Sequence, residues 1–123
     1  MALQRPESVR CIKIPVLRFG ILLFTDREQV EQFERLNEGI DDKLSVWDES
    51  LGFVSHILDS GDGSHCYMMF IRQADHLVIV HECSHMVTII MNYCGIECDE
   101  MRARLMEHLF KKVCRAVGLE CLG

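Results

Sequence analysis

Apolar and polar residues follow one another in an order that predicts strands and then a helix in the first third of the chain. Residues 10–17 (RCIKIPVL) alternate between apolar and polar types, and residues 19–24 (FGILLF) form a short apolar run. Both patterns are typical of strands. Thr25 or Asp26 then caps a helix over residues 27–36, which carries an apolar stripe on an otherwise charged surface.

The middle of the chain predicts a β-hairpin. Residues 52–58 (GFVSHIL) and 65–71 (HCYMMFI) have strand-forming composition, and the segment 59–63 (DSGDG) between them is a strong turn signal. The returning strand could present an edge on which an extended peptide binds. The polar segment 41–51 before the hairpin is a predicted loop, with Trp47 as its packing anchor.

The last part of the chain predicts two helices joined by a tight turn. Asp75 is a suitable N-cap for a helix over residues 77–93, and Gly95 fits the left-handed residue after its end. This helix is apolar nearly all round, so we expect it to be buried. Asp99 then caps a second helix over residues 100–117, which would pack on the first.

The length of 123 residues indicates a single domain, and the predicted elements give it the α+β class over residues 1–123. The net charge of −6 and the absence of a local basic cluster argue against a nucleic-acid partner. Lys111, Lys112 and Arg115 fit the ordinary role of cations at a helix C-terminus. No run of 18 apolar residues and no secretory signal pattern is present, so we expect a cytoplasmic protein that does not span a membrane.

Seven cysteines are many for 123 residues. Their number is odd and no signal peptide precedes them, which favours free thiols over a disulfide framework. The spacing of Cys94 and Cys98 is only a weak metal-binding signal.

The motif His81-Glu82-Cys83-Ser84-His85 is an HExxH pattern inside the first C-terminal helix. Two histidines four residues apart lie on the same side of a helix, where their ring nitrogens can bind one Zn²⁺. Glu82 would then be the base that activates water, as in metallopeptidases.

A catalytic zinc site has a third protein ligand and one open position. Glu100 is the best candidate, because it begins the helix that returns past the motif and could face His85. His108, Glu107 and Asp99 are the alternatives.

The predicted chemistry is hydrolysis of a peptide bond. Zinc lowers the pKa of water, and Glu82 takes the proton and delivers it to the leaving amine. Arg104, one turn after Glu100, could stabilise the oxyanion, hold Glu100 in place, or be an ordinary surface arginine. A second interpretation of the motif is a buried helix whose polar residues are paired by other protein groups.

The stretch HLVIVHECSHMVTIIMNYCGIECDEMRARLMEHL resembles the small HExxH proteins encoded by tailed phages and prophages. The resemblance covers about residues 50–115, and the HExxH, Gly-Ile and Asp-Glu segments carry its specificity. It implies a minimal zincin of the gluzincin type, with His81, His85 and Glu100 as zinc ligands and Glu82 as base.

One position departs from that family. Its members often have a tyrosine four residues after the glutamate ligand, where this chain has Arg104. The change either removes a transition-state donor or gives that role to the arginine. A second resemblance is to SprT-type proteases, which usually belong to larger proteins with a DNA-binding part that this acidic chain lacks.

Three functions follow as hypotheses. The first is a zinc metallopeptidase acting on a protein substrate in a bacterial cytoplasm. The second is a catalytically inactive binding protein on a zincin scaffold, directed at a host or virion protein. The third is a virion or assembly component without chemistry. The sequence does not indicate the oligomeric state.

Overall fold

The computed structural model describes residues 5–14, 19–37, 52–59 and 65–119, and it confirms the predicted α+β class. The predicted loop 41–51 with Trp47 and the turn after Asp59 lie outside these residues. The elements in chain order are β1 (Arg10–Ile14), β2 (Phe19–Phe24), α1 (Arg27–Leu36), β3 (Gly52–Asp59), β4 (His65–Ile71), α3 (His76–Cys94) and α4 (Asp99–Val117).

The strands form one mixed sheet in the order β1-β2-β4-β3. The predicted hairpin is confirmed, because β3 and β4 pair antiparallel, and β4 also pairs parallel with β2. The prediction that β4 presents an edge is therefore wrong: β4 is an inner strand, and β3 and β1 are the edges of the described sheet. The reason is visible in β4 itself, whose Met68 and Met69 point to opposite faces and are both buried.

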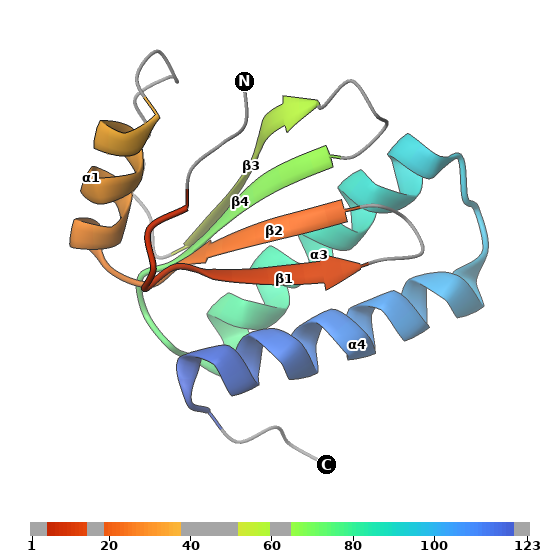
Figure 1. Ribbon diagram of the computed structural model, residues 1–123. Helices are drawn as coiled ribbons and strands as arrows, with labels where there is room; N and C mark the ends of the chain where they lie inside the picture. Colours follow the sequence, from red (N-terminus) through yellow and green to blue (C-terminus); the bar gives the residue numbers. More distant parts are fainter. Residues whose placement is uncertain (1–4, 15–18, 38–51, 60–64, 120–123) are drawn as a thin grey trace.

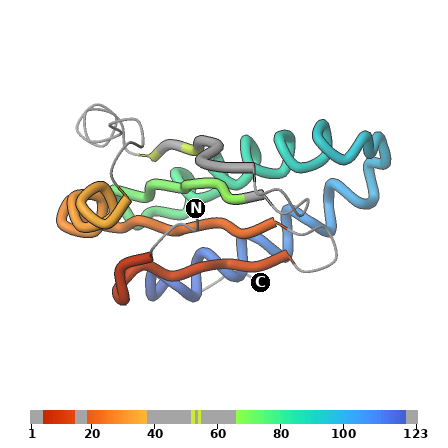
Figure 2. Tube along the Cα trace, turned by 45° about the horizontal axis from the view of Figure 1, so that its top comes forward, coloured from red at the N-terminus to blue at the C-terminus, as the bar shows by residue number. Residues whose placement is uncertain are grey.

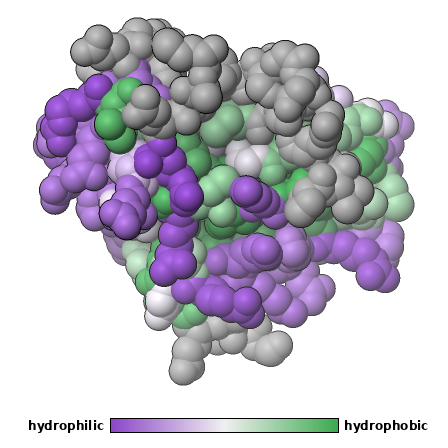
Figure 3. Space-filling view, viewed as in Figure 1, coloured by the Kyte–Doolittle hydropathy of each residue, from purple (hydrophilic) through white to green (hydrophobic). Residues whose placement is uncertain are grey.

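Alternate residues of the inner strands build two separate cores, one on each face of the sheet. On β2, Ile21 packs with residues of α3 and α4, whereas Leu22 packs with residues of α1. The molecule therefore has three layers, with α1 on one face and the α3–α4 pair on the other (Figures 1 and 2). Hydrophilic residues cover α1 and the outer side of α4, and hydrophobic residues show between them over the sheet (Figure 3).

Side-chain caps fix the start of two helices as predicted. The Asp26 carboxylate accepts a hydrogen bond from the Gln29 amide at 2.9 Å, and the Asp75 carboxylate accepts one from the Leu77 amide at 2.8 Å. The prediction for the last helix is wrong by one residue: Cys98 is its N-cap and makes no side-chain capping bond, and Asp99 is already helical.

The expectation that α3 is buried is confirmed for only one side of the helix. One side of α3 packs against the sheet, but Leu77 and Val80 are exposed on the other, Leu77 by 80%. Among the described residues, α3 alone is long and apolar enough to cross a membrane. This is weak evidence for a span, because helices that pack in a protein core have the same length and composition.

Gly95 ends α3 in the left-handed conformation, with φ of 70°. An L-residue in this conformation loses about 1–2 kcal/mol, and a Cβ at Gly95 would meet no other atom within 4 Å. We therefore predict that Gly95→Ala lowers the free energy of unfolding by about 1 kcal/mol, measured by urea denaturation. Gly95→Asn should lose less, because asparagine tolerates this conformation; an equal loss would contradict the backbone explanation.

The free thiols differ widely in burial, and this difference predicts the order in which they are alkylated. Burial is the main cause that raises the pKa of Cys66 to about 11 and that of Cys83 to about 12, whereas Cys94 and Cys98 are exposed. Iodoacetamide at about pH 8 should therefore alkylate Cys94 and Cys98 well before Cys66 and Cys83, because the thiolate is the reactive form. Peptide mapping by mass spectrometry checks the order, with urea-unfolded protein as the control in which the difference disappears.

Candidate functional site

The position of the HExxH motif follows from how α3 packs on the sheet. Apolar side chains at Ile79, Cys83, Met86 and Ile90 are fully buried, and their spacing defines the side of α3 that faces the core. Each residue turns the helix by about 100°. Glu82 is three residues after Ile79 and four before Met86, so it also points toward the sheet, and only 6% of it is exposed.

His81 and His85 lie together on the exposed side of α3. Their Nε2 atoms are 3.1 Å apart, and the two rings are nearly perpendicular, with an interplanar angle of 82°. Two nitrogens bound to one tetrahedral zinc at about 2.0–2.1 Å would be about 3.3–3.4 Å apart. The pair is thus within a few tenths of an ångström of the geometry of two zinc ligands. Without a metal, the same contact is a hydrogen bond between one protonated and one unprotonated ring nitrogen.

Glu82 packs against the backbone of Gly52 at the start of the edge strand β3. A Cβ placed on Gly52 would lie 2.6 Å from Cγ of Glu82 and 2.8 Å from its Oε2. Only glycine permits this approach, and sequence reasoning missed the residue. The available signal was a glycine at the first position of a predicted strand, which often marks a close backbone contact.

Burial raises the pKa of Glu82, and the positive charge of His81 and His85 acts in the opposite direction. A groove of about 400 Å³ connects this carboxyl group to solvent. Gly52, Leu77, Val78, His81 and Glu82 line it. One wall is therefore the edge of the sheet, the other is the first half of α3, and a carboxyl group and an imidazole lie between them.

The other two predicted site residues, Glu100 and Arg104, lie elsewhere. Their side chains form an exposed ion pair with Oε1 and Nε 3.1 Å apart. Arg102 is the residue of this turn that reaches α3, where it donates to the Thr88 hydroxyl at 3.0 Å. Two residues along a helix correspond to a rotation of about 200°, so Glu100 and Arg104 face away from α3.

Axial distance separates Glu100 from the histidine pair as well. α3 continues to Cys94, nine residues beyond His85, and this is roughly 13 Å of helix. Within the described part of the chain, no three His, Cys, Asp or Glu side chains come close enough to hold a metal ion. The structure therefore brings His81 and His85 together, but it does not add Glu100 or the alternatives Asp99, Glu107 and His108.

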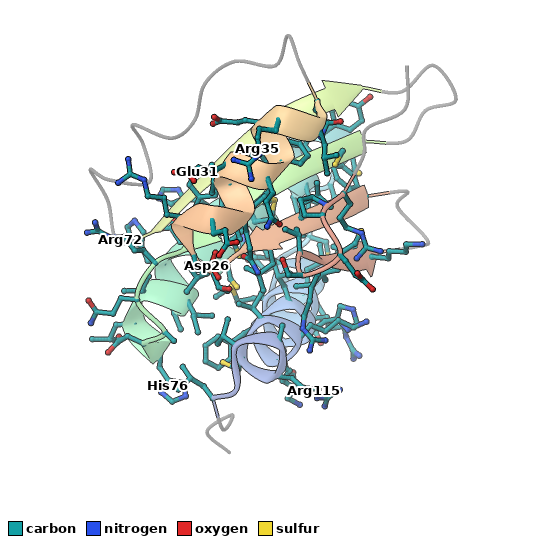
Figure 4. All side chains as sticks on the ribbon, turned by 60° about the vertical axis from the view of Figure 1, so that its left-hand side comes forward. Asp26, Glu31, Arg35, Arg72, His76 and Arg115 are labelled. Carbon is teal, nitrogen blue, oxygen red and sulfur yellow. The ribbon has the colours of Figure 1, made fainter. Side chains whose placement is uncertain are left out.

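Two of these alternatives have other surroundings. Glu107 accepts a hydrogen bond from Lys111 at 2.9 Å, which lowers its pKa, and His108 is exposed. His76, at the start of α3, lies against Phe110 of α4, with ring centroids 6.1 Å apart. His76 and Arg115 consequently mark the same end of the antiparallel helix pair (Figure 4).

Comparisons of the chain with protein-family models, curated proteins and solved structures found no match. The resemblance to small zincins rests on the residues of this chain alone, and the function that it implies is argued below as a proposal.

The contact between Gly52 and Glu82 yields a prediction in the form of a double-mutant cycle. Gly52→Ala forces a methyl group onto the Glu82 side chain and should lower the free energy of unfolding by about 1–3 kcal/mol. In a Glu82→Ala background the obstructing atoms are gone, so the same substitution should be nearly neutral, with a coupling of about 1 kcal/mol or more. Urea denaturation of the four proteins measures the coupling.

Gly95→Ala is the matched control for this cycle, because a Cβ at Gly95 meets nothing within 4 Å. Its effect should be the same with and without Glu82. A Gly52→Ala loss that is also unchanged in the Glu82→Ala background would contradict the proposed contact.

Proposed function

We propose that this protein is a zinc-dependent metallopeptidase-like protein in which His81 and His85 bind the metal and Glu82 is the general base. The observation that supports it best is the 3.1 Å approach of the two Nε2 atoms, because His81 also lines the groove that contains the Glu82 carboxyl group. The resemblance to phage and prophage proteins extends the proposal to a protein substrate in a bacterial cytoplasm.

The donor set fits part of a catalytic zinc site. Neutral imidazole is a good zinc ligand, and both histidines are accessible from solvent. Zinc bound there would act as a Lewis acid and lower the pKa of water. Glu100 stays a predicted third ligand, although in this structure it is bound to Arg104 and faces away from α3.

The residues of the chain itself have separable roles in the proposed reaction. The Glu82 carboxylate would accept a proton from a water molecule in the groove and return it to the leaving amine. Gly52 sets the position of that carboxylate through its backbone. Leu77 and Val78 form the apolar part of the groove, next to which a substrate side chain would lie.

A second candidate function is a binding protein that retains the zincin scaffold without catalysis. It is favoured by the lack of a third ligand beside the histidine pair among the described residues. Exposed Leu77 and Val80 on α3 would then belong to a surface for a partner protein. Glu82 argues for the first candidate, because a binding surface has no need of a carboxyl group buried beside two histidines.

Measurement of the zinc content tests whether His81 and His85 bind the metal. We predict about one zinc per chain in the purified protein after addition of zinc and gel filtration, and loss of that zinc in His85→Ala. His108→Ala is the matched control, since His108 is an exposed histidine of α4 outside the pair. Equal zinc content in all three proteins would show that the pair is not the site, and no zinc in any of them would favour the scaffold hypothesis.

Catalysis is tested separately with Glu82→Gln, which keeps the shape of the side chain and removes the base. The variant should retain zinc and lose cleavage of an unfolded protein substrate by about a hundredfold or more. Cleavage that is unchanged in Glu82→Gln would exclude the proposed mechanism. Absence of cleavage in the zinc-loaded wild-type protein, across denatured and peptide substrates, would favour the second candidate.

A further inference from the structure

A second groove, of about 410 Å³, lies between β1 and the C-terminal half of α4, away from the histidine pair. Of the seven described residues that line it, four are basic: Arg10 and Lys13 from β1, and Lys112 and Arg115 from α4. The other three are Cys11, Ile12 and Ala116, so no acidic side chain among the described residues lines the groove. No basic cluster is present locally in the sequence, and the fold brings these four residues together from two distant segments.

The concentration of positive charge is notable in a protein with a net charge of −6. All four cationic side chains are exposed, and within the described residues none of them forms an ion pair with an acidic side chain. Like charges brought together in a groove repel each other and raise the affinity for an anion. This arrangement favours an anionic ligand over a neutral one.

The helix dipole of α4 explains the position of only two of the four cations. Lys112 and Arg115 lie near the C-terminus of α4, where cations interact favourably with the helix dipole. Arg10 and Lys13 are on a strand about 100 residues earlier in the sequence and have no such role. Charged residues also protect edge strands from aggregation, but that protection does not require a groove or a single sign of charge.

The geometry of β1 indicates the shape of the ligand. Arg10 and Ile12 alternate with Cys11 and Lys13 across the strand, yet all four line the groove. A groove touches both faces of a strand only where it follows the strand's edge. In the described sheet β1 pairs with β2 alone, so its outer edge has backbone donors and acceptors available for another strand.

We propose that this groove binds an acidic, extended peptide segment of a partner protein, which adds to the edge of β1. Main-chain hydrogen bonds would hold the segment beside β1, and its carboxylates would contact the four cations. Hydrophilic residues gather over this part of the molecule in Figure 3, and Arg115 projects from the outer side of α4 in Figure 4. The proposal does not depend on zinc binding or catalysis at the first groove.

A nucleic acid is the competing polyanion, and the groove suits it less well. Single-stranded nucleic acids are usually bound by aromatic side chains on which bases stack, together with cations. None of the lining residues in the described part of the chain is aromatic. The overall negative charge of the protein also opposes the long phosphate backbone, whereas a short acidic peptide meets only the local positive field.

The test is fluorescence anisotropy with a labelled decapeptide of alternating Glu and Thr, at low and physiological salt. The wild-type protein should bind it, and Lys112→Glu should weaken binding by about tenfold or more. Lys111→Glu is the matched control, because it makes the same charge change at the neighbouring position of α4, outside the groove. Lys13→Glu provides an independent variant on β1, and circular dichroism confirms that each variant is folded.

Two further probes separate the parts of the proposal. A peptide of the same sequence with every backbone amide N-methylated keeps the charge but lacks backbone donors on both edges, and it should bind at least about tenfold more weakly. Equal affinity for this peptide, equal affinity of Lys111→Glu and Lys112→Glu, or no binding by the wild-type protein would overturn the proposal. Tighter binding of a DNA oligonucleotide of the same charge would overturn it in favour of a nucleic-acid ligand.

Discussion

The rotational position of α3 against the sheet determines the candidate site. Ile79, Cys83, Met86 and Ile90 are fully buried, and their burial leaves a single favourable orientation for the helix. A rotation by one residue would bring His81 toward the core in place of Glu82 and expose apolar side chains on the other side. Because the histidines are four residues apart, the same constraint that exposes His81 also exposes His85 and places their Nε2 atoms 3.1 Å apart.

Local patterns in the sequence were sufficient to predict the helices and strands and the pairing of His81 with His85. Alternating strands, Asp26 and Asp75 as caps, and a left-handed Gly95 are properties of a few neighbouring residues, so they could be predicted. The prediction that Glu100 faces His85 did not use such a pattern. Leu105, Leu109 and Val113 mark the core side of α4, and Glu100 lies on the opposite side, where its side chain is 72% exposed.

Features that depend on contacts between distant parts of the chain could not be predicted from local patterns. Gly52 belongs to the site only because β3 lies across α3, and the basic groove exists only because β1 lies beside α4. A count of charges along the sequence separates Arg10 and Lys13 from Lys112 and Arg115 by about 100 residues. Pairing of β4 with β2 was also not predictable, although the apolar residues on both faces of β4 were consistent with an inner strand.

Glu82 is the residue that best separates the two proposed functions. A carboxyl group packed beside an apolar core loses hydration, and this raises its pKa and disfavours its charged form. The positive field of His81 and His85 opposes that effect, and a metal ion on the same pair would oppose it more strongly. Burial of Glu82 is therefore least unfavourable when the histidines carry a positive charge or a metal. A scaffold that only bound a partner would be more stable with an apolar residue here, so the carboxylate in the groove supports the catalytic proposal over the binding one.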